Sequence, residues 1–215
     1  MILRLLYYSP TLFIAVVLAI LCAFTIHEFS HAFAAYLLGD NTAKDCGRLT
    51  LNPLVHIDVI GFLLLLMAGF GWGKPVPYNP YNLRNKRYGS AIVGLAGPGA
   101  NLICLFLFGY LFKFLSPIVG PHNLFSIFLM FLVIYNAVLM VFNLIPIPPL
   151  DGSKILLTLL PPQFNYFKIM LITRGPFILL VLILLSNLLG LPIFSGLFNG
   201  IINLCQKMFG RFPLI

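Results

Sequence analysis

The sequence predicts an all-α polytopic membrane protein, a bundle of about four to six transmembrane or re-entrant helices. Of its 215 residues, 60% are hydrophobic and only 8% are charged, whereas soluble domains carry about 25% charged residues. Several apolar runs approach or exceed the roughly 20 residues that cross a bilayer. We expect residues 1–215 to form one membrane-embedded domain, with its core over 10–160 and further helices over 161–215.

The first predicted helix covers residues 10–38. Ser9 supplies an N-cap, Pro10 occupies the first helical position, and Gly39 is a stop signal. Such a helix is about 43 Å long, which is enough to cross a bilayer with some tilt. The apolar N-terminal run enters this helix without a small-residue cleavage site, so we expect an uncleaved span rather than a signal peptide.

The segment that follows is predicted to contain a short strand and a re-entrant helix. The alternation in "RLTLN" is typical of a strand. Residues 57–71 are apolar but short for a span, which favours a segment that enters the bilayer and returns. The prolines of "WGKPVPYNPYNLRNKRYG" exclude a helix and favour an extended loop or an edge strand.

Further helices are predicted over residues 88–115 and 123–145. The first contains "GLAGPGAN", whose small residues allow a neighbouring helix to approach closely. The second ends in "NLIPIPPLDG", where the prolines must break it. A short amphipathic stretch then runs to Leu160, an apolar segment covers 175–190, and a weaker one covers 192–209.

The distribution of basic residues predicts the orientation in the membrane. If residues 57–71 return to their own side, one face carries nine basic residues, namely Lys44, Arg48, Lys74, Arg84, Lys86, Arg87, Lys154, Lys168 and Arg174. Arg4 and Lys113 lie on the other face, and the side of Lys207 and Arg211 depends on the tail. This asymmetry places the nine-residue face in the cytoplasm and the N-terminus outside. The net charge of +8 forms no basic stripe, so a nucleic-acid partner is excluded.

The motif His27-Glu28-x-x-His31 predicts half of a metal site. Histidines four apart on a helix lie about 40° apart around its axis and about 6 Å along it, so both can bind one ion. Glu28, the only glutamate, is offset by about 100° and can lie beside the metal as a general base. The alternative is a pair of histidines bonded to backbone or packed side chains. Catalytic zinc takes three protein ligands, so a single Zn²⁺ per chain needs one more.

Asp151 is the best candidate for the third ligand. The other aspartates lie in the loop after the first helix or at the start of the re-entrant segment. Asp151 follows a proline-broken helix end, where a carboxylate at membrane depth needs a partner such as a dication. His27 lies about 25 Å along its helix from Pro10, in the cytoplasmic third of the bilayer, and Asp151 arrives near the same end.

Several segments of the chain resemble those of the site-2 protease family of intramembrane zinc metalloproteases. "HEFSH" and "NLIPIPPLDG" are similar to the paired motifs of that family. "GRLTLNPLVHID", "GWGKPVPYNPYNLRN" and "GLAGPGANL" are similar to segments of its short bacterial and archaeal members, without a PDZ-type insert. The resemblance covers roughly residues 20–160. It implies zinc held by His27, His31 and Asp151, with Glu28 as the general base. It also implies a small membrane-associated β region between the first two core helices.

For function, the resemblance implies peptide-bond hydrolysis of membrane-spanning protein substrates, as in regulated intramembrane proteolysis. Asn143 is the first candidate for a hydrogen-bond donor to the oxyanion, and Asn101 is the second. The alternative for Asn143 is a cap of its own helix, and the alternative for Asn101 is a hydrogen bond between two helices. The "GRLTLN" strand is a candidate to hold an unwound substrate. His56 and Asp58 favour a turn with an Asp cap over a second metal site. The alternative function is a non-catalytic membrane protein that carries metal or binds clients, but a non-ligating glutamate favours the protease.

Overall fold

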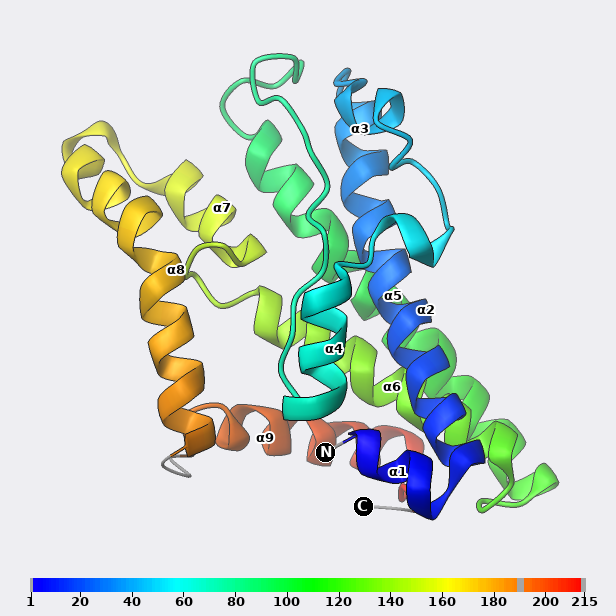
Figure 1. Cartoon of the computed structure of the whole chain (residues 1–215). Helices are drawn as coiled ribbons and strands as arrows, with labels where there is room; N and C mark the ends of the chain where they lie inside the picture. The colour runs from blue at the N-terminus through cyan, green and yellow to red at the C-terminus, as the bar shows by residue number, and fades with distance from the viewer. Residues whose placement is uncertain (1, 189–191, 214–215) are drawn as a thin grey trace.

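The computed structural model describes residues 2–188 and 192–213, and every regular element in these ranges is a helix (Figure 1). Four helical segments are long and apolar enough to cross a membrane, namely Pro10–Leu37, Gly89–Val119, Leu124–Asn143 and Pro162–Ser186. The predicted all-α class with several spans is thereby confirmed.

Three long helices form the centre of the molecule. They are α2 (Pro10–Leu37), α5 (Gly89–Val119) and α6 (Leu124–Asn143), and they pack against one another. Their starts and ends agree with the predicted helices to within a few residues, and the Ser9 hydroxyl accepts a hydrogen bond from the Leu12 amide as the expected N-cap. The buried contacts are made by small and apolar side chains, such as Ala19, Met130, Val133 and Ala137. Since lipid tails are as apolar as these side chains, close packing rather than water exclusion holds the three helices together.

The short helix α4 (Val59–Ala68) and the chain after it form a hairpin. Ten residues span only about 15 Å, half of a hydrocarbon core. After Gly69, with φ of 78°, the chain turns and runs back along α4 (Figure 1). A Cβ on Gly71 would lie 2.8 Å from the Leu65 Cβ, so this close return requires glycine. The hairpin has the form predicted for a segment that re-enters its own side.

The predicted β region is wrong. Residues 49–51 form a bend before a short 3₁₀ turn, η1 (Pro53–Val55), and residues 70–79 are extended without a partner strand. A ladder needs successive backbone donors, and Pro75 and Pro77 supply none. Instead the Lys74 amide donates to the His56 carbonyl at 2.8 Å, and the Lys74 carbonyl accepts from Arg48. "GRLTLN" is therefore not a strand on which a substrate can be held.

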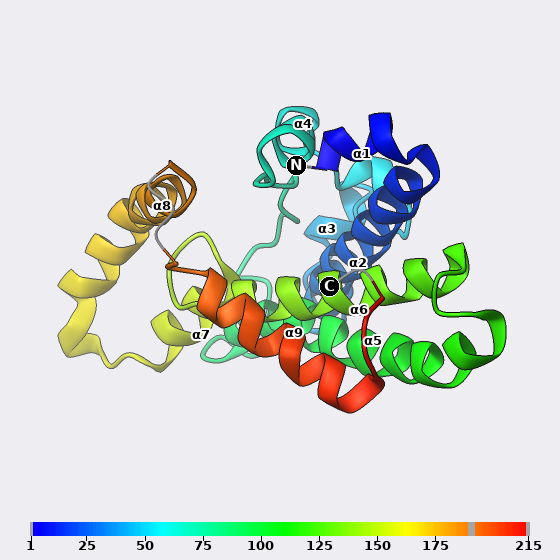
Figure 2. The ribbon, with the colours of Figure 1, turned by 90° about the horizontal axis from the view of Figure 1, so that it is seen from below.

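Two helices lie across the end of the bundle that carries both chain termini (Figures 1 and 2). The first, α1 (Ile2–Tyr8), was not predicted. The second, α9 (Ser195–Phe209), agrees with the weak segment at 192–209 and packs on α5 and α6 through Cys205 and Phe209. The Lys113 ammonium donates to the Met208 carbonyl at 3.0 Å. Lys207 and Arg211 therefore belong to the same end as α1.

The remaining helices follow the proline-rich loop. A short helix α7 (Asp151–Leu159) leads through η2 (Pro162–Phe164) into α8 (Asn165–Leu188), which stands to one side of the bundle (Figure 1). α8 begins well before the predicted 175, and positions 189–190 of the predicted segment lie outside the described residues. Leu179 and Ile183 pack with Leu150, so α8 contacts the loop that precedes Asp151.

Asp40 ties the loop after α2 to the segment before α5. Its fully buried carboxylate accepts hydrogen bonds from the Thr42 amide (3.2 Å), the Thr42 hydroxyl (2.6 Å), the Asn79 amide (2.7 Å) and the Asn82 side chain (3.0 Å). Burial alone would raise the pKa of Asp40, but these hydrogen bonds outweigh it and hold that pKa below its ordinary value.

We expect Asp40→Ala to lower the free energy of unfolding by about 2–3 kcal/mol, because several hydrogen bonds to a charged group are lost. Because the folded pKa is depressed, the contribution is fully present above the ordinary pKa of about 4 and is lost as the pH falls through the folded value. Thermal unfolding in detergent between pH 7 and pH 3 measures both effects. Asp45→Ala, at an exposed position of α3 (Thr42–Asp45), is the control. Equal shifts of the unfolding temperature in Asp40→Ala and Asp45→Ala would contradict the stabilising role of Asp40.

Candidate metal centre

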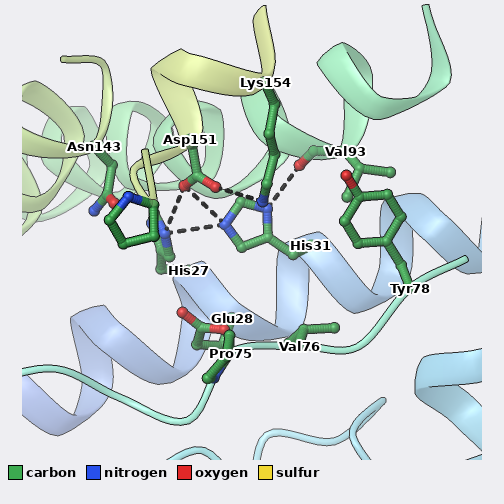
Figure 3. Close-up of a pocket in the computed structure, with 11 residues that line it drawn as sticks. His27, Glu28, His31, Pro75, Val76, Tyr78, Val93, Asn143, Asp151 and Lys154 are labelled. Carbon is green, nitrogen blue, oxygen red and sulfur yellow. Dashed lines mark hydrogen bonds and ion pairs between the residues drawn. The ribbon is translucent and has the colours of Figure 1, made fainter. Parts of the chain in front are cut away.

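A small pocket lies where α2, α5, α7 and the extended segment meet (Figure 3). Its volume is about 110 Å³, and it is lined by His27, Glu28, His31, Pro75, Val76, Tyr78, Val93, Asn143, Pro149, Asp151 and Lys154. Helix α2 contributes His27, Glu28 and His31 to this pocket, and the first turn of α7 contributes Asp151. The two motifs, far apart in the sequence, therefore share one buried space.

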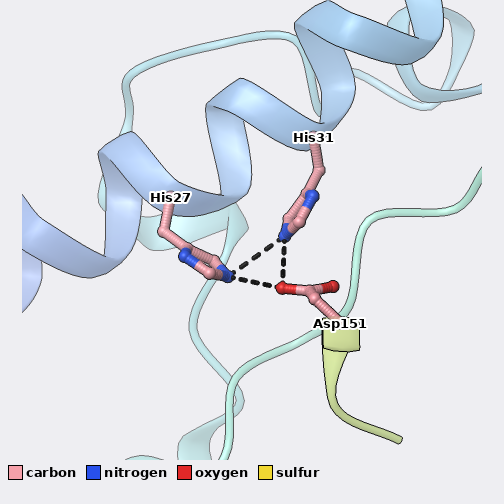
Figure 4. A group of neighbouring side chains, drawn as sticks. All are labelled: His27, His31 and Asp151. Carbon is pink, nitrogen blue, oxygen red and sulfur yellow. Dashed lines mark hydrogen bonds and ion pairs between the residues drawn. The ribbon is translucent and has the colours of Figure 1, made fainter. Parts of the chain in front are cut away.

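The three predicted ligand atoms converge in this pocket (Figure 4). The Asp151 Oδ2 atom lies 3.1 Å from His27 Nε2 and 3.0 Å from His31 Nε2. The two Nε2 atoms are themselves 3.0 Å apart. Ligand atoms of a tetrahedral zinc site, at bond lengths of about 2.0 Å, lie about 3.3 Å from one another. The triangle therefore has the size that zinc requires.

Both histidine rings are held with their Nε2 lone pairs toward the centre of this triangle. His27 Nδ1 lies 2.6 Å from the Asn101 Oδ1, and His31 Nδ1 lies 2.6 Å from the Val93 carbonyl oxygen. Since both oxygens can only accept, both Nδ1 atoms must carry the proton and both Nε2 atoms are free to bind a metal. Two lone pairs and a carboxylate oxygen at this separation repel one another unless a cation lies between them. The donor set thus fits zinc.

Asp151 is held as a charged ligand. It occupies the first turn of α7, where the helix dipole favours a carboxylate, and its second oxygen accepts a hydrogen bond from the Lys154 ammonium at 2.9 Å. The positive charge of Lys154 at this distance favours the ionised form of the carboxyl. The carboxylate is therefore ionised at neutral pH.

Glu28 lies beside the three ligands without joining them. It is buried and lines the pocket, and Figure 3 shows it on the side that Pro75 and Val76 cover. Among the described residues, no side chain or amide donates a hydrogen bond to its carboxylate. A buried carboxylate without such a donor is suited to accept a proton from a water molecule in the pocket.

Comparison with known proteins identifies the family. Residues 121–183 match the model described as "Peptidase family M50". "Putative zinc metalloprotease YwhC" of Bacillus subtilis is 41% identical over 168 residues, which make up 74% of this chain and 75% of that protein. The chain belongs to peptidase family M50.

Two further relatives agree with this assignment. "Putative zinc metalloprotease Rip2" of Mycolicibacterium smegmatis is 35% identical over 157 residues, 70% of this chain and 59% of the relative. Rip2 of Mycobacterium tuberculosis strain H37Rv is 29% identical over 197 residues, 88% of this chain and 72% of the relative. No solved structure gives a significant match. This M50 protein is a zinc metallopeptidase, and its four apolar helices fit a multi-pass membrane protein.

The two asparagines of the M50 protein occupy different places. Asn143 lines the pocket, and its amide donates to the Leu139 carbonyl at 3.0 Å, which leaves its other N–H group for a ligand. Asn101 lies outside the pocket, fully buried behind His27. Its amide donates to the Asn136 Oδ1 at 2.8 Å and to the Ala23 carbonyl at 3.2 Å. These two bonds fit the alternative that Asn101 links helices to one another. They also fix the position of the Asn101 Oδ1 atom, which orients the His27 ring toward the metal position.

Four residues that sequence reasoning did not assign to the site also shape it. Lys154 binds Asp151 from three positions along α7, Tyr78 lines the pocket, Val93 holds His31 through its carbonyl, and Gly97 lies against both histidines. A Cβ on Gly97 would lie 2.6 Å from the His27 Cε1 atom and 2.7 Å from the His31 Cε1 atom. The close approach predicted for "GLAGPGAN" is thus confirmed.

A spacing of four connects Val93 and Gly97 with Asn101 and could have revealed these two residues. Residues 93, 97 and 101 share one face of α5, as residues 23, 27 and 31 share one face of α2. By contrast, Asp58 caps α4 through the Gly61 amide at 2.9 Å, and the buried His56 Nε2 atom lies 2.9 Å from the Thr50 carbonyl oxygen. Neither His56 nor Asp58 joins a group of three potential metal ligands among the described residues.

Proposed function

We propose that this M50 metallopeptidase cleaves peptide bonds of membrane-spanning proteins in the described pocket. His27, His31 and Asp151 would hold the zinc ion, and Glu28 would act as the general base. The observation that carries the proposal is the convergence of three donor atoms beside an unpaired glutamate, within a bundle of apolar helices. Regulated intramembrane proteolysis is the corresponding biological role.

The chemistry follows from the positions of the side chains. Zinc, when bound, supplies a Lewis acid that polarises a peptide carbonyl and acidifies a water molecule. Glu28 accepts one proton from the water as its oxygen attacks the carbonyl carbon. Asn143 donates its remaining N–H to the oxygen that becomes negative. As the C–N bond breaks, Glu28 returns the proton to the leaving amine, so the enzyme regains its starting state.

The pocket restricts the form of the substrate. An α-helix with side chains is about 10–12 Å wide, whereas the pocket has a volume of only about 110 Å³. A membrane-spanning helix must therefore unwind before its carbonyl reaches the ligands. We expect substrates with helix-breaking residues near the cleaved bond to be preferred, because unwinding costs them less.

The orientation is part of the proposal. The face with nine basic residues would lie in the cytoplasm, with α1 and the N-terminus outside. The end that carries α1 also holds Arg4, Lys113, Lys207 and Arg211, which leaves the excess of basic residues on the opposite end. The metal centre would then open toward the cytoplasmic half of the bilayer.

The test uses purified protein in lipid vesicles with a membrane-spanning reporter substrate. Treatment with a zinc chelator should abolish cleavage, and added Zn²⁺ should restore it, whereas Mg²⁺, which prefers oxygen ligands, should not. A soluble peptide with the same cleaved sequence but without apolar flanks should be a poor substrate. Cleavage that survives chelation would overturn the metallopeptidase mechanism, and equal cleavage of the soluble peptide would overturn the membrane-spanning substrate class.

A further inference from the structure

We propose that Lys154 is a positioning residue that holds Asp151 as a metal ligand through a single oxygen. The proposal rests on the metal site described above and adds a residue to it. Lys154 neither belongs to the ligand triangle nor carries a role in the mechanism so far. It lines the same pocket, however, and touches one of the three ligands directly.

The two oxygens of Asp151 are divided between two tasks. Oδ2 lies at 3.0–3.1 Å from both histidine Nε2 atoms, at the metal position. Oδ1 lies 2.9 Å from the Lys154 ammonium. A carboxylate with both oxygens free can bind a cation through both. An ammonium bonded to Oδ1 removes this option, so one position beside the metal stays open for water, as catalytic zinc requires.

Lys154 is itself held in this pose from two sides. Its stem lies against α5 at Gly94, where a Cβ would come within 3.1 Å of the Lys154 Cβ and Cδ atoms. Its ammonium lies 5.5 Å from the centre of the Tyr78 ring, within the range of a cation–π contact. Because Tyr78 belongs to the extended segment, that segment helps to place the lysine over Asp151 (Figure 3).

The experiment compares wild-type protein, Lys154→Met and Lys154→Arg in the same detergent, after the metal is removed and replaced by Zn²⁺ or Co²⁺. Lys154→Met keeps an unbranched side chain that is one atom shorter and removes its charge, and Lys154→Arg keeps a donor to Oδ1. The matched control is Lys44→Met, because Lys44 also lies over a tyrosine ring, Tyr36 at 5.0 Å, but is not among the residues lining the pocket. The readouts are metal stoichiometry, the visible absorption of bound Co²⁺ and cleavage of the reporter.

We expect Lys154→Met to keep one metal ion per chain, since all three ligands remain. Its Co²⁺ spectrum should change from the strong absorption of four-coordinate cobalt to the weaker absorption of a five-coordinate ion, as Oδ1 joins the metal. Cleavage should fall by about 10-fold or more, as for other residues that support metal ligands. Lys154→Arg should restore both readouts, and Lys44→Met should change neither.

An unchanged Co²⁺ spectrum in Lys154→Met would overturn the proposal, and so would the same change in Lys44→Met. If Lys154→Met does not fold, Tyr78→Leu serves as the second variant, because it removes the contact that places the ammonium, and an unchanged spectrum in that variant counts equally against the proposal. Failure of the proposed function has a different signature. In that case the wild-type protein binds neither Zn²⁺ nor Co²⁺, or its cleavage is insensitive to chelation.

Discussion

Glu28→Gln is expected to lower the cleavage rate by about 10³-fold or more while the protein still binds one zinc ion. The amide has nearly the shape of the carboxylate but cannot accept the proton of the attacking water, and general bases contribute up to about 10⁴-fold. The ligand triangle of His27, His31 and Asp151 does not include Glu28, so metal binding should persist. Zinc content by atomic spectroscopy and cleavage in vesicles separate the two effects.

The matched control for this variant is Asp58→Asn, another replacement of an acid by its amide. Asp58 caps α4 through the Gly61 amide and lies outside the pocket, and asparagine caps helices about as well. Its activity should remain within about two-fold of wild type. Substantial cleavage by zinc-loaded Glu28→Gln protein would remove Glu28 from the mechanism and leave the proton transfer to another group.

Gly97→Ala is expected to produce the second large effect, the loss of the metal site itself. The added Cβ would lie 2.6–2.7 Å from the Cε1 atoms of both histidines, closer than nonbonded carbon atoms approach. Either the rings turn away from the centre or α5 moves away from α2. We expect zinc affinity to fall by about 100-fold and thermal stability to fall as well, since inserting a methyl group into a packed interface costs about 1–3 kcal/mol.

Gly99→Ala provides the control on the same helix. Outside the neighbouring residues and backbone of its own helix, a Cβ at Gly99 meets no described atom within 4 Å, so the variant should bind zinc normally and melt at or above the wild-type temperature. The comparison cancels the general effect of replacing glycine in α5. Zinc affinity in Gly97→Ala equal to that in Gly99→Ala would show that the rings do not depend on this close approach.

The helices of this protein could be predicted from the sequence because their signals are local. Apolar length defines the spans, Ser9 and Pro10 mark the start of α2, and prolines mark the end of α6. The spacing of His27 and His31, together with the depth of Asp151, was enough to select the residues that the structure brings together. Local sequence signals are sufficient where one helix period or one helix length decides the geometry.

The features that the sequence missed or left open depend on a distant neighbour. The alternation in "RLTLN" favours a strand, but a strand also needs a partner, and the nearby extended segment offers prolines in place of donors. The place of Asn101 depends on which face of α5 meets α2, which composition alone does not give. Tyr78 carries no local signal, because only the return of the chain past α4 brings it to Lys154.

The hydrogen bonds behind His27 would also make zinc binding depend on the packing of three helices. Asn101 joins the backbone of α2 at Ala23 to Asn136 of α6, and it holds His27 at the same time. A chain whose three helices have inserted but not yet docked has no such support and lacks Asp151 beside its histidines. With the proposed ligands, such a chain would bind zinc only weakly. Occupancy of the site would report that the helices have reached their final register, and zinc in turn would stabilise that register because it binds only the assembled form.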